Sequence, residues 1–357
     1  MYPRLRINLA HLRRNVQTLS RLCAQHGIRM SGVTKVFRGD PVIADILVQG
    51  GISMLGDSRV ANLRRLEGIP AEKWLIRPPM LSETKELVRF GDASLNSEIE
   101  VIRAIDREAL RQGRRHKIIL MADLGDIREG YVDYGELLAA ARETAGMRGA
   151  ELYGLGVNLT CFSFVQPDTE KMAELCALAQ RISDAVGFSL PVVSGGNSAT
   201  IDLMLRGGIP EGINNLRLGE SVLFGKERAK YQFLPDTFHD VFTLECEIVE
   251  LKEKPSLPWG QIGVDSYGNR PSLVDRGPHR LKAVCALGKQ DFDAETTLPL
   301  DPGILMLGAS SDHLMLDLTD SERSYHVGDS VALQLGYFST MRAFTSDYVE
   351  KVYEDQL

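Results

Sequence analysis

The sequence has few cysteines, only two tryptophans and no long hydrophobic run. Its five cysteines lie far apart and form no C-x-x-C pair, which favours reduced thiols over disulfides or a zinc site. No stretch approaches the roughly 18 apolar residues of a membrane span, and the first residues lack the apolar core of a signal peptide. We therefore expect a protein of the cytoplasm.

A block of basic residues is also absent. The 357 residues carry a net charge of −7, so a nucleic-acid footprint or binding to an anionic membrane is not expected. With 44% hydrophobic and 25% charged residues, the chain is long enough to form two globular domains. Chemistry on a small molecule is the function class that remains.

Between residue 29 and about residue 220, a short apolar or β-branched run is followed by a polar or glycine break and then by a helix-period segment. The runs that we interpret as strands cover 29–36, 52–58, 73–79, 93–97, 116–125, 151–160, 190–198 and 214–219. Alternation of strand and helix predicts a parallel sheet, and eight repeats predict an α/β fold of the TIM-like (β/α)8 barrel type. A doubly wound open sheet is the alternative.

From about residue 236 the pattern changes to strands separated by Pro, Gly and Asp turns. We therefore divide the chain into a barrel over residues 1–235 and a β-rich C-terminal domain over residues 236–357. The opening segment 5–27 predicts a strand and a helix, and this strand is available to pair with the C-terminal sheet.

Two glycine-containing segments follow the last two predicted barrel strands. "SGGNSAT" brings Asn197, Ser198 and Thr200 to the start of a helical run, and "LRLGES" brings Gly219 to the start of another. Backbone amides at such positions bind anions, and barrels commonly bind phosphate after strands seven and eight. These segments predict a phosphate site.

Lys35 stands at the end of the first predicted strand, in "GVTKVFRGD". Strand alternation would place Val33, Lys35 and Phe37 on one inward face, where a free ammonium is costly to bury. A desolvated lysine can condense with an aldehyde, and an aldehyde that also carries a phosphate is pyridoxal phosphate. The alternative is a structural lysine that extends from the strand end to solvent.

Four segments in this order, "GVTKVF", "DLGDIREG", "GGNSAT" and "LRLGESVLFG", resemble the alanine-racemase-type pyridoxal-phosphate enzymes of fold type III. The resemblance covers essentially the whole chain and is strongest to the ornithine racemase subgroup. It implies a barrel followed by a β domain, an amino-acid racemase and a homodimer with shared active sites.

The resemblance also implies roles for individual residues. Lys35 would bind pyridoxal 5'-phosphate covalently and serve as one of two proton-transfer bases. Arg128 would meet the substrate carboxylate, although a surface pairing with Asp126 or Glu129 is the alternative. The cofactor contacts would be Asn158 near the ring, Arg217 at the pyridine nitrogen, and Ser198, Thr200, Gly219 and the amide of Glu220 at the phosphate.

The second base departs from the family pattern. Related racemases carry a tyrosine in a "G-Y-x-D" element, whereas "ALGKQDFD" here has Lys289 at that place. We take Lys289 and Asp312 as the leading candidates for the second base. Tyr267, His313 and Cys285 remain open.

The substrate and two other reactions are also open. An ornithine substrate would need an acidic partner for its distal ammonium, either Asp312 or Glu220, and lysine or alanine remain alternatives. Other functions considered are a non-catalytic cofactor carrier, which lacks the extra β domain, and a basic-amino-acid decarboxylase, whose "C-E-S-x-D" element is missing. A metal-assisted aldolase would need an H-x-C or H-x-D pair that the segment around His313 lacks, so we expect no metal.

Overall fold

The computed structural model describes residues 1–264, 268, 270 and 272–355. The chain forms two compact units, which are described separately. One consists of Leu9–Val241 with Asp355, and the other of Met1–Asn8 with Phe242–Glu354. The chain thus passes from one unit to the other at residues 241 and 242, six residues beyond the division drawn from the sequence.

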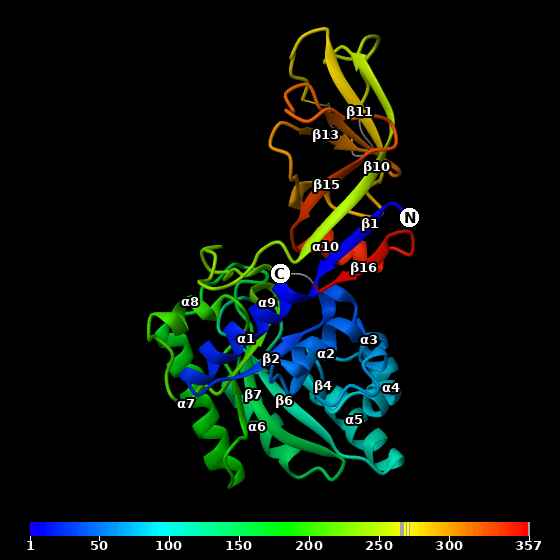
Figure 1. Cartoon of the computed structure of the whole chain (residues 1–357). Helices are drawn as coiled ribbons and strands as arrows, with labels where there is room; N and C mark the ends of the chain where they lie inside the picture. Colours follow the sequence, from blue (N-terminus) through cyan, green and yellow to red (C-terminus); the bar gives the residue numbers. More distant parts are fainter. Residues whose placement is uncertain (265–267, 269, 271, 356–357) are drawn as a thin grey trace. The chain divides into compact units, whose positions relative to one another are not determined.

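The first unit is a closed barrel of parallel strands with helices around it (Figure 1). Its strands are β2 (Arg29–Val33), β3 (Met54–Asp57), β4 (Glu72–Leu75), β5 (Ala93–Asn96), β6 (His116–Ala122), β7 (Ala150–Val157), β8 (Val192–Ser194) and β9 (Asn215–Leu218). They pair in chain order, and β9 closes the barrel on β2. The predicted barrel is confirmed, and the open sheet is excluded.

The helices of this unit are α1 (Leu9–Gln25), α2 (Pro41–Gln49), α3 (Val60–Arg65), α4 (Thr84–Phe90), α5 (Ile99–Gln112), α6 (Tyr134–Ala145), α7 (Thr169–Val186), α8 (Thr200–Leu205) and α9 (Glu220–Phe224). Several begin at aspartates whose carboxylates accept backbone amides of the first turn: Asp40 for α2, Asp133 for α6 and Asp168 for α7. Gly187, at φ +81°, ends α7 in the left-handed conformation that favours glycine.

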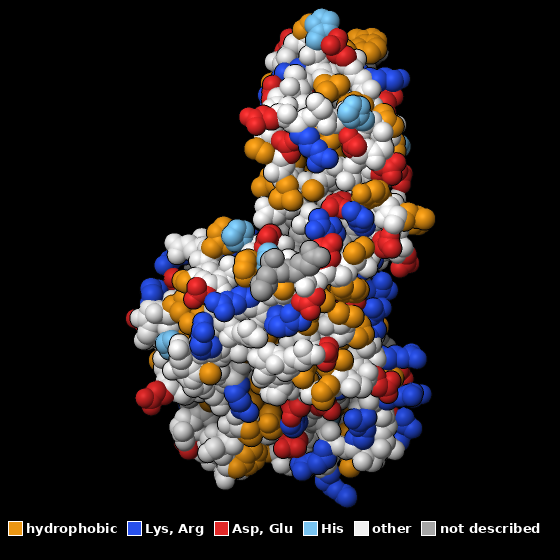
Figure 2. All heavy atoms as spheres, in the orientation of Figure 1, with side chains coloured by type: hydrophobic (Ala, Val, Ile, Leu, Met, Phe, Trp, Pro, Cys, Tyr) orange, Lys and Arg blue, Asp and Glu red, His pale blue; other side chains and the backbone are white. Residues whose placement is uncertain are grey.

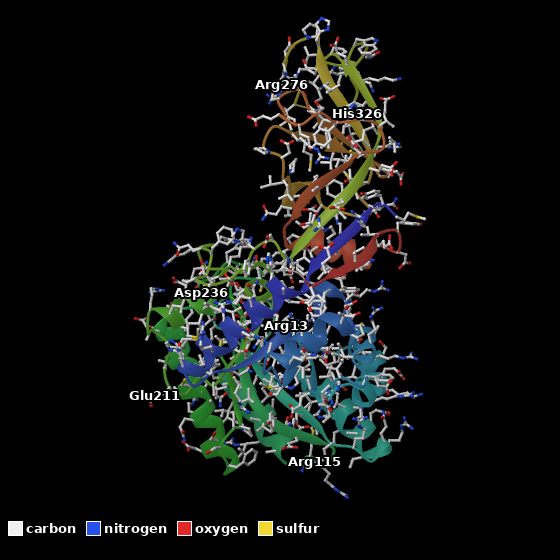
Figure 3. All side chains as sticks on the ribbon, viewed as in Figure 1. Arg13, Arg115, Glu211, Asp236, Arg276 and His326 are labelled. Carbon is white, nitrogen blue, oxygen red and sulfur yellow. The ribbon has the colours of Figure 1, made fainter. Side chains whose placement is uncertain are left out.

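Apolar side chains fill much of the barrel interior. Strand alternation directs Met54, Trp74, Ala93, Leu95, Ile119, Met121 and Val192 into one buried cluster. Polar residues occupy other inward positions, Ser31 on β2, Ser194 on β8 and Asn215 and Arg217 on β9, as described below. Figure 3 labels Arg115 and Glu211, which precede β6 and β9 and mark the amino-terminal end of the barrel, opposite the strand ends that carry the candidate site.

The second unit is built on one mainly antiparallel sheet. Its elements are β1 (Arg4–Asn8), β10 (Phe242–Lys254), β11 (Arg280–Ala286), β12 (Thr297–Pro299), β13 (Leu305–Ala309), β14 (His313–Asp317), β15 (Ser330–Leu335), α10 (Tyr337–Thr345) and β16 (Glu350–Glu354). The main strand order is β12-β15-β10-β11-β14-β13. The strand β1 pairs antiparallel with β10 and parallel with β16.

Ion pairs join β1 to its two neighbours. Arg6 lies 3.0 Å from the carboxylate of Glu245 on β10 and 2.8 Å from that of Glu354 on β16. These charge-assisted contacts help to hold β1 between β10 and β16. The β-rich character predicted for this part of the chain is confirmed, but the short helix α10 was not expected.

The surface carries charges of both signs. Figure 2 shows Lys and Arg side chains interspersed with Asp and Glu over the face of each unit in view. None of the helices in the described part of the chain is long and apolar enough to cross a membrane.

Candidate active site

The turn that carries Lys35 is fixed by its neighbours. Thr34 donates a hydrogen bond from Oγ1 to the carboxylate of Asp57 at 2.6 Å. A Cβ at Gly39 would lie 2.8 Å from the carbonyl oxygen of Asn62, so only glycine fits there. These contacts hold the backbone on both sides of Lys35, whose side chain is half-buried.

The expectation that Val33, Lys35 and Phe37 share one strand face is wrong. The strand β2 ends at Val33, and Lys35–Phe37 form a 3₁₀ turn that Arg38 ends at φ 56°. Such a turn has three residues per turn instead of a period of two, so Phe37 is buried with Val36 while Lys35 is not. Lys35 therefore lies just beyond the strand end.

Arg217 lies on β9, next to β2 in the barrel, and its side chain is only 4% exposed. Its guanidinium donates to Ser194 Oγ at 2.6 Å and to the carbonyl oxygen of Val157 at 2.9 Å. No carboxylate in the described part of the chain forms an ion pair with it. Burial lowers the pKa of Arg217 to about 10.

A chain of hydrogen bonds across the barrel interior supports this arginine. Ser194 Oγ donates to Asn215 Oδ1 at 2.6 Å, and Asn215 Nδ2 donates to Ser31 Oγ at 2.8 Å. All three residues are fully buried at inward positions of β8, β9 and β2. Since each polar group has a partner, the chain fixes the guanidinium without a charged contact.

The predicted phosphate segments meet at the carboxyl ends of β8 and β9. Ser198 Oγ and Ser221 Oγ lie 3.0 Å apart, and Ser198 Oγ also accepts from the Ser221 amide. One hydroxyl of the pair donates to the other, which leaves one hydroxyl proton for an external acceptor. Thr200, by contrast, donates its hydroxyl proton to the carbonyl oxygen of Gly195 at 2.8 Å and closes the loop.

Gly219 brings the end of β9 close to β2. A Cβ at Gly219 would lie 3.0 Å from Cβ of Val33, two residues before Lys35. Because β2 and β9 are hydrogen-bonded neighbours, the Lys35 turn and the segment after Gly219 lie at the same end of the barrel. The lysine and the candidate phosphate loop are thus brought together as predicted from the barrel topology.

Asn158 directly follows Val157, whose carbonyl oxygen accepts from Arg217. Its side chain is only 8% exposed, and its Oδ1 accepts from Asn197 Nδ2 at 3.2 Å. Its Nδ2 is buried with no hydrogen-bond partner among the residues that the structure describes. A buried donor without an acceptor is costly, so this atom indicates a place for a ligand acceptor.

Arg128 follows β6, and its side chain is 37% exposed. It pairs with the carboxylate of Glu129, as one of the alternatives above allowed. Asp126 is not its partner, because that carboxylate is buried and accepts the amides of residues 161–163 at 3.0–3.2 Å. The guanidinium has five donors, so the pair with Glu129 leaves some of them for a substrate carboxylate.

Glu220 has cationic neighbours. Its carboxylate lies 3.2 Å from Arg228 and 4.0 Å from Lys226. Arg228 also donates to the hydroxyl of Tyr231 at 2.6 Å and contacts the backbone of Ser198. The Glu220 carboxylate is therefore already neutralised, which disfavours it as the partner of a substrate ammonium.

Lys289 and Asp312 lie on adjoining loops of the C-terminal unit. The amide of Lys289 donates to the carbonyl oxygen of Ser310 at 2.9 Å, and Gly288 packs so tightly on this loop that it has no room for a Cβ. The carboxylate of Asp312 accepts from Gln290 at 2.5 Å and from Ser311 at 2.6 Å, both neutral donors. Lys289 and Asp312 are both exposed.

The remaining second-base candidates differ in exposure. Cys285 is fully buried on β11, which removes it from contact with a substrate, whereas His313 is exposed at the start of β14. Tyr267 lies outside the described residues. Within the described ranges, no group of three His, Cys, Asp or Glu side chains could hold a metal ion.

The alanine racemase N-terminal domain family matches residues 7–227. The chain belongs to this family. It is 41% identical to the ornithine racemase of Acetoanaerobium sticklandii, an alignment that covers 98% of this chain and 99% of that protein. It is 39% identical to the lysine racemase of Thermotoga maritima over the full length of both chains.

Among solved structures, the alanine racemase of Bartonella henselae with covalently bound pyridoxal phosphate is similar to this chain, with a TM-score of 0.72. The identity is 16%, and the match covers 98% of this chain and 99% of that one, which shows a shared fold. The resemblance stated from the sequence is confirmed. The half-buried Lys35, the Ser198–Ser221 hydroxyl pair and the buried donor of Asn158 fit pyridoxal phosphate in this family member.

Sequence reasoning missed several residues of the site. These are the polar interior residues Ser31, Ser194 and Asn215, the hydroxyl partner Ser221, the loop anchor Asp126, and Arg228 beside the phosphate loop. For Asn215 a signal was present, because it stands two positions before Arg217 and strand alternation places both on the inward face. The others depend on pairings between distant segments.

Proposed function

We propose that the protein is a pyridoxal-phosphate-dependent amino-acid racemase and that ornithine is its preferred substrate. One observation carries the proposal. The half-buried Lys35 follows β2, and the buried Arg217 lies on the neighbouring strand β9. Among the described residues, Arg217 has no ion pair with a carboxylate. The near full-length identity to an ornithine racemase supports the substrate. We expect the enzyme to work in the cytoplasm.

Lys35 would hold the cofactor and then accept or return the α-proton on one face of the substrate. When bound, pyridoxal phosphate supplies an electron sink for the α-carbanion. Arg217 would face the pyridine nitrogen, and its guanidinium donates hydrogen bonds but accepts none. A donor at that position disfavours protonation of the nitrogen, which favours rapid return of the proton over transamination.

The phosphoryl group would be held by Ser198, by the backbone at Gly219 and by the amide of Glu220. The hydroxyl pair with Ser221 supplies the remaining O–H donor. Thr200 would act through the loop that its bond to Gly195 closes, and Asn158 would donate from Nδ2 to an acceptor on the cofactor ring. Arg128 would bind the substrate carboxylate with the donors that Glu129 does not occupy.

For the opposite face we propose Lys289 as the second base and Asp312 as the partner of a distal ammonium. Among the described residues, the Asp312 carboxylate accepts hydrogen bonds from the neutral side chains of Gln290 and Ser311, so its charge is available to a cation. The Glu220 carboxylate, by contrast, already pairs with Arg228. We propose a homodimer in which the C-terminal unit of one chain supplies these groups to the barrel of its partner.

The test is to measure cofactor absorbance and loss of optical activity with L-ornithine, L-lysine and L-alanine. Lys35→Ala is expected to abolish both, because no other amine can replace the covalent attachment. Lys73→Ala is the matched control, since Lys73 is the second residue of β4, at the other end of the barrel, and its ammonium donates to the carbonyl oxygen of Ile69. It should retain absorbance and turnover.

Other results would contradict the proposal. Absorbance without turnover of any amino acid would indicate a cofactor carrier, and release of carbon dioxide would indicate a decarboxylase. For the second base, Lys289→Ala should slow deuterium incorporation from one enantiomer of ornithine more than from the other. Equal slowing from both enantiomers would exclude Lys289.

A further inference from the structure

The loop that follows β6 holds two opposite charges side by side. Arg128 donates from Nε and Nη2 to the two carboxylate oxygens of Glu129, so the ion pair is bidentate. The side chain of Glu129 is only 9% exposed, and that of Arg128 is 37% exposed. Among the described residues, Glu129 is the only hydrogen-bond partner of this guanidinium. A carboxylate that is largely shielded from water therefore fixes the orientation of Arg128.

The backbone of this loop has little freedom. The carboxylate of Asp123 accepts three amides of the loop, including that of Arg128 at 3.1 Å. A Cβ at Gly130 would lie 2.5 Å from the backbone nitrogen of Asp123, so glycine is required there. Arg128 and Glu129 stand between these two anchor points. The loop therefore presents both side chains from a fixed backbone.

The pair lies near the buried arginine of the candidate cofactor site. Burial has the largest effect on the pKa of Arg217, and the charges of Glu129 and Arg128 follow, acting in opposite directions. Charges influence each other mainly within about 10 Å at ordinary ionic strength. A carboxylate with a net role only on the outer surface would not be expected at this distance from Arg217.

The contact with Glu129 decides which donors of Arg128 remain. A guanidinium can bind a carboxylate with two parallel hydrogen bonds along an edge that includes Nε or along the edge formed by Nη1 and Nη2. Glu129 occupies the edge that includes Nε. A second carboxylate can therefore form two hydrogen bonds only along the Nη1–Nη2 edge, and the negative charge of Glu129 weakens its attraction to Arg128.

We propose that Glu129 is a positioning residue that fixes Arg128 for end-on binding of the substrate carboxylate and at the same time weakens that binding. The inference rests on the proposed function, because the carboxylate is that of an amino-acid substrate. Tight binding of the substrate by itself does not speed the reaction, whereas a fixed orientation of its α-carbon relative to Lys35 does. Loss of Glu129 should therefore strengthen carboxylate binding and slow turnover, a combination that general damage to the loop does not produce.

The experiment compares Glu129→Gln with Glu136→Gln in the holoenzyme. Glu136 is an exposed carboxylate in the first turn of α6 and serves as the matched control. Binding of butanoate and of its uncharged amide, butanamide, is measured by NMR titration, because neither compound has an amine that forms an imine. We expect Glu129→Gln to bind butanoate about threefold or more tighter and butanamide equally, since the full charge of Arg128 then acts on one carboxylate. Arg128→Met should remove the preference for butanoate.

Turnover of L-ornithine is the second measurement. Glu129→Gln should lower kcat by about tenfold or more without raising KM, because a small misplacement of the substrate has an effect of this size. Glu136→Gln should change neither constant. Glu129→Asp keeps the charge, so its affinity for butanoate should stay within about twofold of that of the unsubstituted protein.

Four results would overturn the proposal. They are butanoate binding that Glu129→Gln does not tighten, equal tightening by Glu129→Asp and Glu129→Gln, a raised KM in Glu129→Gln, and a kcat that Glu129→Gln leaves unchanged.

The binding measurement does not depend on turnover, so the two proposals can fail separately. Tighter binding of butanoate by Glu129→Gln, in a protein that racemises no amino acid, would support the effect of Glu129 on Arg128 and contradict the proposed function. Racemisation by a protein in which Glu129→Gln changes neither butanoate affinity nor kcat would support the proposed function and overturn the role of Glu129.

Discussion

Replacing Arg217 with methionine should abolish turnover and yet stabilise the barrel. The guanidinium is buried, and its hydrogen bonds go to neutral groups, Ser194 Oγ and the carbonyl oxygen of Val157. Methionine has a similar length and carries no charge. The substitution therefore separates the effect of the buried charge on stability from its contribution to turnover.

The magnitude follows from the pKa. Burial lowers the pKa of Arg217 to about 10, which means that the folded chain binds this proton less tightly than the unfolded chain. The charge therefore destabilises the fold at any pH below about 10, and the cost disappears as the pH rises toward the unfolded value. At 1.36 kcal/mol for each tenfold loss of proton affinity, the cost is about 3 kcal/mol.

Methionine removes that cost but leaves the carbonyl oxygen of Val157 without the guanidinium donor, which costs about 1–2 kcal/mol, whereas Ser194 Oγ keeps its hydrogen bond to Asn215. The net expectation is a gain of about 1–2 kcal/mol in the free energy of unfolding, in line with other buried charges replaced by apolar side chains. Ser194→Ala should act in the opposite direction, because it keeps the charge and removes one of its acceptors. We expect Ser194→Ala to lower the free energy of unfolding by about 2 kcal/mol.

The assay is urea unfolding of cofactor-free protein followed by the fluorescence of Trp74, which is fully buried in the barrel. The second tryptophan, Trp259, is 84% exposed in the other unit and is replaced by phenylalanine in every variant. Arg77→Met is the control, since Arg77 bonds the carbonyl oxygens of Ser58 and Pro78 but also pairs with Glu83 at 2.6 Å. Arg77→Met should lower the free energy of unfolding by about 1–3 kcal/mol. Equal destabilisation by Arg217→Met and Arg77→Met would refute the reasoning.

Three further predictions concern the packing, the loop and the pH dependence. Gly219→Ala should weaken pyridoxal-phosphate binding measured by equilibrium dialysis, because its Cβ would press on Val33, whereas Gly187→Ala meets open space and should cost only backbone strain of about 1 kcal/mol. Asp126→Ala should raise KM more than it lowers kcat, since three loop amides lose their acceptor while Lys35 is untouched; an unchanged KM would contradict the role of this carboxylate. Burial lowers the pKa of His116 to about 4, so the unfolded chain binds the extra proton as the pH falls below its ordinary value. The free energy of unfolding should therefore be about 2 kcal/mol lower at pH 5 than at pH 7.5, and His116→Gln should not show this difference. An equal decrease in the unsubstituted protein and in His116→Gln would exclude His116 as the cause.

The sequence predicted the barrel well because its evidence is local. Each strand is a short apolar run, each helix has its own periodicity, and glycine and aspartate mark the junctions. The residues at the carboxyl ends of consecutive parallel strands must then meet at one end of a closed barrel. Lys35 and the phosphate segments could be grouped in this way without coordinates, whereas Arg217 was singled out by the family resemblance.

The errors arose where contacts between distant segments decide the local structure. Thr34 bonds Asp57, 23 residues away, and the chain turns at Lys35 although the sequence there continues a strand-like pattern. The helix α10 has mostly aromatic, β-branched and small residues and a weak intrinsic preference for a helix. The hydroxyl of Ser339 donates to the carbonyl oxygen of Asp293 and accepts from its amide, so tertiary contacts specify this helix.

The geometry of β8 and β9 explains why the polar residues collect on one side of the barrel. These two strands share a single registered pair, Ser194 with Asn215, and beyond it the chain continues as Gly195–Gly196 toward the phosphate loop. Backbone hydrogen bonds nevertheless continue past this pair, from the Gly195 amide to Asn215 and from the Arg217 amide to Gly196, so the start of the phosphate loop stays beside Arg217. Apolar residues at the inward positions of these strands would make a more stable barrel, but they would remove the guanidinium and the hydrogen bonds that hold it at this end of the barrel. The polar interior is therefore the structural cost of a site at this end of the barrel, and Arg217→Met tests that cost directly.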